Sequence, residues 1–532
     1  MSINHRGPSN GPAPHPVTEP EATRPARRVS PWGAGALGLL SGGLALAVAD
    51  LVAGLVAPAA SPVLAVGAAF IDRTPGWLKD AAIARFGTND KTVLLTGMGV
   101  VLAVLSTLAG VVAVRSTRAV TIGAGALAAV AALAAVTRPG AGPVWVVPTI
   151  VGVAAGLTAL LRLVRGRRTP PRPPATAPET VGSRREVLVG VGAVAGLAAL
   201  SAVGGRTLAS RGSSPTQVVL PPARKPVAAP SAATQLSLAG LTPLVTSNPD
   251  FYRIDTALSV PQVDVTNWRV RVHGMVQREF DVDLHELLSG PLVERWLTLA
   301  CVSNEVGGTL AGNARWLGYP LAVLLQRAVP DPRADMVLST SADGWTCSTP
   351  LEALTDGRDA LLAVGMNGNP LPPEHGFPAR MVVPGLYGYV SATKWVVDLE
   401  VTRFDRATAY WTSRGYSAQA PIRTFSRIDV PKPFARVTAG PTQVAGVAWA
   451  QHRGIERVQV RVDGGPWSDA RLADALSRDT WRQWVWAWQA TRGQHTLEVA
   501  ATDGQGQTQP ESRRPPRPDG ATGWHSVVVQ VT

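Results

Sequence analysis

The sequence predicts a multi-domain protein in which N-terminal transmembrane helices are followed by an α+β domain and then by a β-sandwich of immunoglobulin type. The chain has 532 residues, enough for three or four domains at roughly 150 residues each. Its hydrophobic content of 46% and its mean hydropathy of +0.12 are too high for a soluble protein of this size. This composition also excludes a chain that is disordered throughout, a disulfide scaffold and a coiled coil.

The apolar excess is concentrated in the N-terminal part of the chain. Four stretches reach or approach the ~20 residues that cross a bilayer: residues 32–56, 92–114, 119–136 and 144–161. A fifth stretch, residues 187–203, is shorter and rich in glycine and alanine. Basic residues collect in the N-terminal tail, between the second and third stretches and after the fourth, so these segments are expected to be cytoplasmic. We therefore predict a multi-pass anchor in the lipid bilayer of the cell membrane, with the rest of the chain on the extracytoplasmic side.

The fifth stretch is preceded by Arg184 and Arg185. This pair resembles a twin-arginine export signal, although it lies deep inside the chain. The alternative is that the two arginines merely flank a spanning helix on its cytoplasmic side. Residues 58–91 mix charged and apolar side chains and favour a helix lying on the outer membrane surface. No histidine occurs between His15 and His273, so paired histidines cannot hold a haem in the membrane part.

The last hundred or so residues alternate as strands do. Val458, Val460 and Val462 share one face of a strand, and tryptophans repeat with the same period at 484, 486 and 488. Several short strands separated by Asp-Gly turns indicate an antiparallel sandwich of immunoglobulin type. We expect the tryptophans to fill its core or an oligomer contact.

The unit between the membrane part and the sandwich is predicted to be an irregular α+β fold that holds a large ligand in its loops. Residues 297–300 are apolar and short enough to be a buried strand, which places Cys301 at the end of the strand. A free cysteine is often only a small buried hydrophobe, so Cys301 alone leaves a structural and a functional interpretation open.

Several ordered motifs further along the chain favour the functional interpretation. They are Thr298-Leu299-Ala300-Cys301, Met366-Asn367-Gly368-Asn369-Pro370, His375-Gly376-Phe377-Pro378-Ala379-Arg380 and Ser391-Ala392-Thr393-Lys394-Trp395. Together they resemble the sulfite oxidase family of molybdopterin enzymes, and the C-terminal region resembles the dimerisation domain of that family. The resemblance covers about residues 240–532. It implies two-electron redox chemistry at molybdenum, usually oxygen-atom transfer to or from a small-molecule substrate.

The resemblance also implies a role for each motif residue. Cys301 is the expected thiolate ligand of the metal, and Asp343 lies in a loop expected beside the metal, so these two are the candidate catalytic residues. The candidate cofactor-binding residues are Asn248, Tyr252, Arg253, Cys301, Asn367, His375, Arg380, Ser391, Thr393 and Lys394. Cys347 is either an incidental small residue or a second thiol near the site.

The resemblance leaves the substrate and the partners open. Sulfite oxidases place an arginine pair soon after the ligand cysteine, whereas Asn304, Glu305 and Val306 stand here, which disfavours an anion and leaves a neutral substrate such as a sulfoxide open. Without a haem motif, the electrons are expected to come from or go to a separate membrane or periplasmic carrier. A homodimer is possible. Nucleic-acid binding is not expected despite the net charge of +13, because much of the excess flanks the spans. The competing hypothesis is a catalytically silent, membrane-anchored binding protein.

A pterin cofactor inserted in the cytoplasm requires the domain to cross the membrane already folded. The twin-arginine route permits this, which favours the twin-arginine interpretation of Arg184 and Arg185.

The predicted segments are a cytoplasmic tail (1–31), a four-span membrane domain (32–165), a cytoplasmic linker with the twin-arginine motif (166–186), a fifth span (187–204), a tether (205–237), a molybdopterin-binding oxidoreductase domain (238–430) and an immunoglobulin-like dimerisation domain (431–532).

Overall fold

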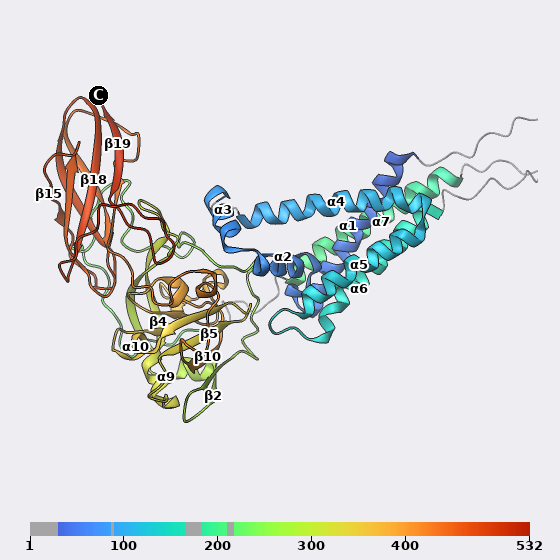
Figure 1. The fold of residues 1–532 in the computed structure, drawn as a ribbon, viewed down its shortest axis with the longest axis horizontal. Helices are drawn as coiled ribbons and strands as arrows, with labels where there is room; N and C mark the ends of the chain where they lie inside the picture. The colour runs from blue at the N-terminus through green and yellow to red at the C-terminus, as the bar shows by residue number, and fades with distance from the viewer. Residues whose placement is uncertain (1–29, 87–89, 166–181, 210–217) are drawn as a thin grey trace, which may run out of the picture.

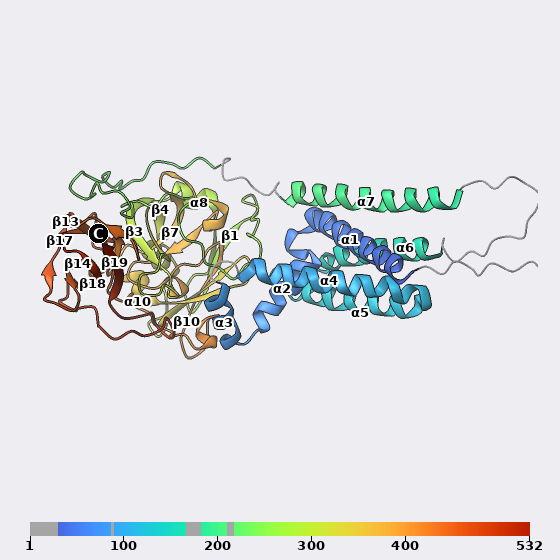
Figure 2. The same cartoon turned by 90° about the horizontal axis from the view of Figure 1, so that it is seen from above.

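The computed structural model describes residues 30–86, 90–165, 182–209 and 218–532. Residues 1–29 of the predicted cytoplasmic tail, most of the linker and residues 210–217 of the predicted tether lie outside the described residues, and so do the side chains of Arg184 and Arg185. Residues 205–209, which we assigned to the tether, form the end of helix α7. A bundle of helices forms one end of the molecule and a β-rich part forms the other (Figures 1 and 2).

Four helices of the bundle are long and apolar enough to cross a membrane, as the sequence predicts. The helices of this part are α1 (Pro31–Val56), α2 (Pro62–Arg73), α3 (Gly76–Phe86), α4 (Asp90–Arg115), α5 (Thr117–Val136), α6 (Val147–Arg165) and α7 (Gly182–Ala209). The four are α1, α4, α5 and α6, the last together with the preceding turn that begins at Pro143. The apolar section of α7, Val189–Gly204, is shorter, and α7 packs along α1.

Small residues allow two of these helices to approach closely. A side chain at Gly38 of α1 would overlap the backbone of α4 at Ser106 and Gly110, and a side chain at Gly110 would overlap α1 in turn. In a membrane, the hydrophobic effect gives little preference for a neighbouring helix over lipid, so helices associate through close backbone packing at small residues. Asp50, near the end of α1, accepts a hydrogen bond from Ser61 at 2.6 Å, so this carboxylate is part of the local structure.

The segment after α1 differs from the expectation of a single surface helix. It forms two helices, α2 and α3, separated at Thr74 and Pro75. Thr74 is extended because the ring of the following proline disfavours helical dihedral angles in the residue before it. Both helices lie at the end of the bundle that faces the β-rich part (Figure 1).

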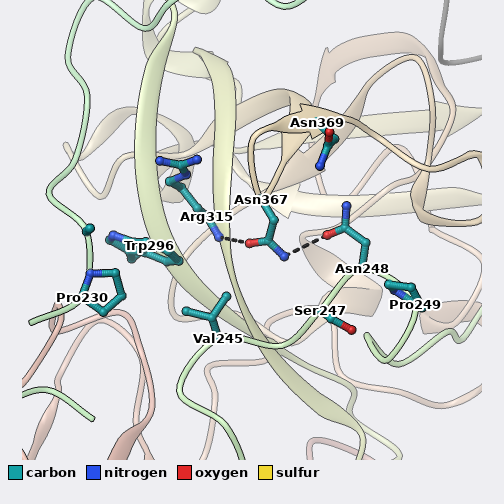
Figure 3. Close-up of a pocket in the computed structure, with 10 residues that line it drawn as sticks. Pro230, Val245, Ser247, Asn248, Pro249, Trp296, Arg315, Asn367 and Asn369 are labelled. Carbon is teal, nitrogen blue, oxygen red and sulfur yellow. Dashed lines mark hydrogen bonds between the residues drawn. The ribbon is translucent and has the colours of Figure 1, made fainter. Parts of the chain in front are cut away.

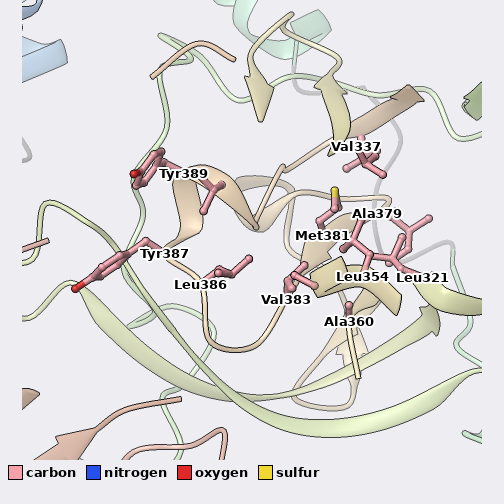
Figure 4. Close-up of a cluster of buried hydrophobic side chains, with 14 of the residues drawn as sticks. Leu321, Val337, Leu354, Ala360, Ala379, Met381, Val383, Leu386, Tyr387 and Tyr389 are labelled. Carbon is pink, nitrogen blue, oxygen red and sulfur yellow. The ribbon is translucent and has the colours of Figure 1, made fainter. Parts of the chain in front are cut away.

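Two sheets form the central domain. Their strands are β1 (Arg269–Gly274), β2 (Phe280–Asp283), β3 (Val293–Ala300), β4 (Ala311–Pro320), β5 (Met336–Ser341), β6 (Thr346–Pro350), β7 (Leu361–Met366), β8 (Asn369–Pro370), β9 (Arg380–Val382) and β10 (Val396–Thr402), with helices α8 (Leu284–Ser289), α9 (Leu321–Ala328) and α10 (Leu351–Thr355). The strand orders are β2-β1-β10-β5-β6 and β3-β4-β7-β8, with β9 paired to β7. Residues from strands, helices and loops, among them Val337, Leu321 and Met381, share one apolar core (Figure 4).

The C-terminal region is a sandwich of two sheets. Its strands are β11 (Phe425–Val430), β12 (Arg436–Val437), β13 (Gly440–Trp449), β14 (Ile455–Val462), β15 (Ser468–Asp469), β16 (Arg471–Leu472), β17 (Arg482–Ala490), β18 (Gly493–Asp503) and β19 (His525–Val531). The sheet β11-β13-β17-β16 packs on the sheet β12-β19-β18-β14-β15 through a shared core. Trp484 and Trp488 are buried in this core, as expected from their spacing, whereas Trp486 is only partly buried against it.

Two segments pair outside the units to which the sequence assigned them. Strand β11, which we placed at the end of the central unit, pairs with β13 of the sandwich. The described part of the tether is docked rather than free. Within it, the backbone of Lys225 bridges to Val293, and the Ala228 carbonyl accepts a hydrogen bond from the Trp296 indole at 3.0 Å.

The first prediction concerns His525 of the sandwich. Its Nδ1 accepts a hydrogen bond from the buried Ile428 N–H at 2.9 Å, and burial, with the nearby Arg427 and Arg513 charges, lowers its pKa from 6.5 to about 4. The unfolded chain therefore takes up the proton first as the pH falls through 6.5, and this stability is lost between pH 6.5 and 4. We expect His525 to account for a loss of about 2 kcal/mol between pH 7 and pH 5.

Thermal unfolding of the full chain in detergent at these two pH values measures the effect. The His525→Asn variant keeps a side-chain acceptor for Ile428 but does not titrate, so its transition should depend less on pH than that of the parent. Equal pH dependence of the two proteins would contradict the assignment.

Candidate functional site

A cavity of about 880 Å³ lies where the central domain meets α2, α3 and the start of α4. Seven of the residues singled out in the sequence line it: Tyr252, Arg253, Cys301, Asp343, His375, Arg380 and Lys394. They come from distant segments of the chain, and the two sheets of the central domain bring them together. The cavity is therefore the candidate site.

Cys301 directly follows β3, as predicted from its sequence. Its N–H donates to the Leu310 carbonyl at 2.9 Å, and its carbonyl accepts from the Asn304 N–H at 3.1 Å, so a tight turn fixes the cysteine at the strand end. Burial raises the pKa of the thiol. A metal ion reverses this effect because a coordinating thiol is deprotonated. The site therefore offers one soft ligand at a rigid position.

Arg380, the first residue of β9, is buried, with 6% of its surface exposed. Its guanidinium donates to the carbonyls of His375 at 3.1 Å and Ala392 at 3.4 Å and lies 5.2 Å from the centre of the Trp316 ring. Among residues 30–86, 90–165, 182–209 and 218–532, no carboxylate lies within ion-pair distance of it. Burial lowers its pKa to about 10. Burying a cation without an acidic partner is costly, which indicates a site for an anionic group.

Lys394, by contrast, has an acidic partner. Its Nζ lies 2.6 Å from Asp255, which also binds Arg253 at 2.9 Å and Lys91 of α4 at 2.5 Å. Burial alone would raise the pKa of the Asp255 carboxyl, but the Lys394 and Lys91 charges outweigh it and hold that pKa well below its usual range. Burial lowers the pKa of Lys394 to about 8. One carboxylate therefore joins two candidate cofactor residues to a helix of the bundle.

His375 closes the 3₁₀ turn Pro373–His375. Burial lowers its pKa to about 4, so the imidazole is neutral at pH 7. Its Nε2 lies 2.9 Å from the Asn248 carbonyl, and because a carbonyl only accepts, Nε2 carries the hydrogen. The other ring nitrogen, Nδ1, is then an acceptor. This arrangement suits contact with a hydrogen-bonding ring system rather than with a bare phosphate.

Asn248 and Asn367 line a neighbouring pocket of about 570 Å³ instead of the main cavity (Figure 3). The Asn367 amide donates to the Asn248 side-chain oxygen at 2.8 Å, and its own oxygen accepts from the Arg315 N–H at 2.9 Å. Because Asn248 also holds His375, the two pockets are linked through this residue. The structure thus places both asparagines beside the cavity rather than in its wall.

Ser391, Thr393 and Cys347 are buried outside the cavity wall. Ser391 donates to the Tyr387 carbonyl at 2.9 Å, and the Thr393 hydroxyl lies 2.7 Å from Ser339. Cys347 of β6 is a free thiol whose pKa burial raises to about 11. Each of these side chains has a polar neighbour within the fold, Cys347 with its sulfur 3.8 Å from the Thr349 hydroxyl, and none of them lines the cavity.

Sequence reasoning missed several residues of the site. Asp255 stands two residues after Arg253 and was not singled out, and Lys79, Lys91 and Tyr410 also line the cavity. The acid at Asp255, within a segment of expected cofactor residues, was a usable signal. The two lysines carried none, because their partners lie more than 150 residues away along the chain.

Comparison with known proteins agrees with this geometry. A model of the oxidoreductase molybdopterin binding domain matches residues 257–411. Sulfite oxidase of Gallus gallus is 31% identical to this chain, and the alignment covers 50% of this chain and 69% of that protein. Mitochondrial sulfite oxidase of Mus musculus is 29% identical, and the alignment covers 54% of this chain and 62% of that protein. Among solved structures, the sulfane dehydrogenase SoxCD of Paracoccus pantotrophus aligns over 54% of this chain and 82% of its own, with 24% identity and a TM-score of 0.49. The chain spans 62% of the length of the mouse and human relatives.

The match makes residues 257–411 a molybdopterin-binding oxidoreductase domain, and Cys301 and Arg380, which line one cavity, both lie within it. The chain belongs to the sulfite oxidase family of molybdopterin-dependent oxidoreductases. Membership implies a molybdenum–molybdopterin cofactor, which the sequence also predicts. The cavity fits this group, because Cys301 offers a soft ligand and Arg380 an unpaired cation for a phosphate.

The second prediction concerns Arg380. Replacement by Met removes charge-assisted hydrogen bonds of about 1.5–3 kcal/mol, so we expect cofactor binding to weaken by about ten- to a hundredfold. Arg380→Lys keeps the charge but not the planar fork and should recover only part of it. Molybdenum and pterin per mole of purified protein measure the effect.

Arg427 is the matched control, since it is also 6% exposed but is paired with Asp429 at 2.7 Å outside the cavity. Arg427→Met should lower stability while the folded protein still loads cofactor. If Arg380→Met loaded as well as Arg427→Met, Arg380 would be a structural residue only.

Proposed function

We propose that this chain is a membrane-anchored, molybdopterin-dependent oxidoreductase that performs two-electron redox chemistry, by oxygen-atom transfer, on a small substrate outside the cytoplasm. The observation that carries the proposal is that Cys301 and Arg380, separated by 79 positions in the sequence, line one cavity. When bound, the cofactor supplies the metal that accepts or donates the oxygen atom and the electrons.

The residues of the chain would bind and orient this cofactor. Cys301 would hold the metal, Arg380 the phosphate, and Tyr252, Arg253, His375 and Lys394 the remaining polar groups. Asn367 would hold Asn248, and Asn248 would in turn position His375. Ser391 and Thr393 would position the backbone that carries Lys394. Asp343 lines the cavity and accepts a hydrogen bond from the Trp345 N–H at 3.1 Å, so it is positioned to act on the substrate side.

An uncharged substrate, such as a sulfoxide, is the substrate class that we propose. Residues 304–306 do not line the cavity and therefore do not support this substrate class. The support comes instead from Phe70, Leu78 and Phe86, apolar side chains of α2 and α3 that line it. An anion would have to enter past these side chains and lose its hydration there.

The orientation of the bundle supports the proposed location. Helix α4 ends and α5 begins at the end of the bundle remote from the β-rich part (Figure 2). Arg115 and Arg118 stand at this turn, and Arg162 and Arg165 lie in the last turn of α6. Basic residues favour the cytoplasmic side, so the cavity would face outward. A separate membrane or periplasmic electron carrier and a homodimer through the sandwich are further parts of the proposal.

The test uses the full chain purified in detergent. Molybdenum and pterin analysis comes first, followed by two assays: sulfoxide reduction with a reduced dye as donor, and sulfite oxidation with an oxidised dye as acceptor. We expect about one molybdenum per chain and the first activity. Activity with sulfite alone would overturn the substrate class, and a protein without molybdenum or either activity would favour the silent, membrane-anchored binding protein.

A further inference from the structure

The cavity has a second wall that does not belong to the molybdopterin domain. Apolar side chains from α2, α3 and the start of α4 form it, and we call them the cap: Phe70, Ile71, Leu78, Ala82, Phe86, Val93 and Leu94. Phe70, Leu78, Phe86 and Val93 are each between 40% and 55% exposed. The cap therefore presents apolar surface that packing within the protein leaves uncovered.

Polar contacts hold the cap on the central domain. Lys79 Nζ lies 2.6 Å from the Tyr410 hydroxyl, Lys91 binds Asp255 at 2.5 Å, and Arg414 donates to the Asp72 carbonyl at 2.8 Å. The loop after α5 adds a contact, since Arg138 donates to the Asp343 carbonyl at 3.5 Å. Four separate contacts tie the bundle to the rim of the cavity, so the cap is a built wall of the site.

Helix α4, which supplies Val93 and Leu94 of the cap, is one of the helices that are apolar enough to cross a membrane, so the cap lies where that bundle meets the cavity. A molecule dissolved in the outer leaflet would meet exposed apolar side chains there. An apolar molecule would pass from the lipid to the cavity along the apolar surface of the cap, without crossing water.

Two features of the cavity favour a flat, uncharged ring as the ligand. Its lining includes the aromatic side chains Trp345, Tyr410 and Trp411, on which a ring can stack. Lys79 and the Tyr410 hydroxyl supply donors for ring oxygens. The sequence of the membrane part has no paired histidines that could hold a haem. The electrons for the redox reaction would therefore come from a lipid-soluble two-electron carrier that reaches the cavity directly.

We propose that the space between the cap and Cys301 binds a lipid-soluble quinol, which delivers two electrons directly to the site. This inference rests on the proposed function, because it assumes the membrane anchor and the redox reaction. With a sulfoxide as acceptor, the quinol gives up two electrons and two protons and leaves as the quinone, and the sulfoxide oxygen leaves as water with those protons. The two substrates would use the cavity in turn.

The experiment uses the cofactor-loaded full chain in nanodiscs of lipid free of quinone. Short-chain benzoquinone and naphthoquinone analogues that carry an azide are bound and photolysed, and the labelled peptides are identified by mass spectrometry. We expect labelling within residues 70–94 or around Tyr410, suppressed at least tenfold by excess unlabelled quinone. Labelling confined to other membrane helices, or labelling that excess quinone does not suppress, would overturn the proposal.

A matched pair of variants separates a binding wall from a general effect of charge. Leu78 in the cap is 40% exposed and Val323 of α9, outside the cavity, is 39% exposed. Leu78→Glu should lower the labelling and the quinol-supported rate at least tenfold, whereas Val323→Glu should change neither. Molybdenum content and the melting temperature of both variants establish that they are folded. Equal labelling of the two variants would refute the site.

Two donors distinguish failure of this inference from failure of the proposed function. If reduced dye supports sulfoxide reduction by the parent protein and short-chain quinol does not, the quinol site is wrong and the proposed function stands. If neither donor supports the reaction in a protein that contains molybdenum, the proposed function itself fails.

Discussion

Cys301→Ser is expected to lower turnover more than about a hundredfold. Removing a residue that only hydrogen-bonds to a metal ligand already lowers metal affinity or activity by about 10–100-fold, and Cys301 is expected to be the ligand itself. Serine keeps the size of the side chain, but its hydroxyl is neither soft nor acidic enough to replace a thiolate. Turnover with a dye donor and molybdenum content, measured on the same preparation, test this. We expect the pterin to be retained at least in part, because Arg380 and Lys394 are unchanged.

Cys347→Ser is the matched control. Both cysteines are buried free thiols of the central domain, but only Cys301 lines the cavity. Cys347→Ser should keep the turnover and the molybdenum, at a cost of about 1–3 kcal/mol for burying a hydroxyl. If the two variants behaved alike, Cys301 would be a packing residue and the metal would have another ligand.

The position of Cys301 could be predicted because it depends on local signals. Four apolar residues followed by turn formers indicate a strand end, and β3 ends at Ala300. The alternating valines and tryptophans of the sandwich were equally local signals. The split between α2 and α3 was also encoded locally, by Pro75, but the amphipathic composition of residues 58–91 obscured it.

The division of the site residues between cavity, neighbouring pocket and core could not be predicted from the sequence. Asn367 and Thr393 belong to motifs as distinctive as that of Arg380, yet Asn367 bonds to Asn248 and Thr393 to Ser339. Which side chain of a motif faces a ligand depends on how two sheets pack, and neighbours in sequence do not specify that. The same reason hid the contacts that hold the cap on the central domain, because Lys79 and Lys91 have the pattern of ordinary interfacial charges.

Asp255→Asn is expected to lower the free energy of unfolding by about 3–5 kcal/mol, the usual cost of removing one partner from a buried ion pair. The Asp255 side chain is 5% exposed and lies within ion-pair distance of Arg253, Lys91 and Lys394. Asparagine cannot neutralise these cations, and Lys394, whose side chain is 10% exposed, would remain buried without its carboxylate. Denaturant unfolding of the full chain in detergent measures the loss.

Asp331→Asn provides the comparison for this loss. Asp331 binds Arg333 at 2.7 Å, but the arginine side chain is 73% exposed, so solvent screens the pair and we expect a much smaller loss of stability than for Asp255→Asn. The two carboxylates differ in what they connect. Asp255 joins Lys91 of the bundle to Lys394 of the cavity wall, so its loss should also reduce cofactor content, whereas Asp331→Asn should leave it unchanged. A loss of stability with normal cofactor content would mean that Asp255 holds only the bundle to the domain and does not position Lys394.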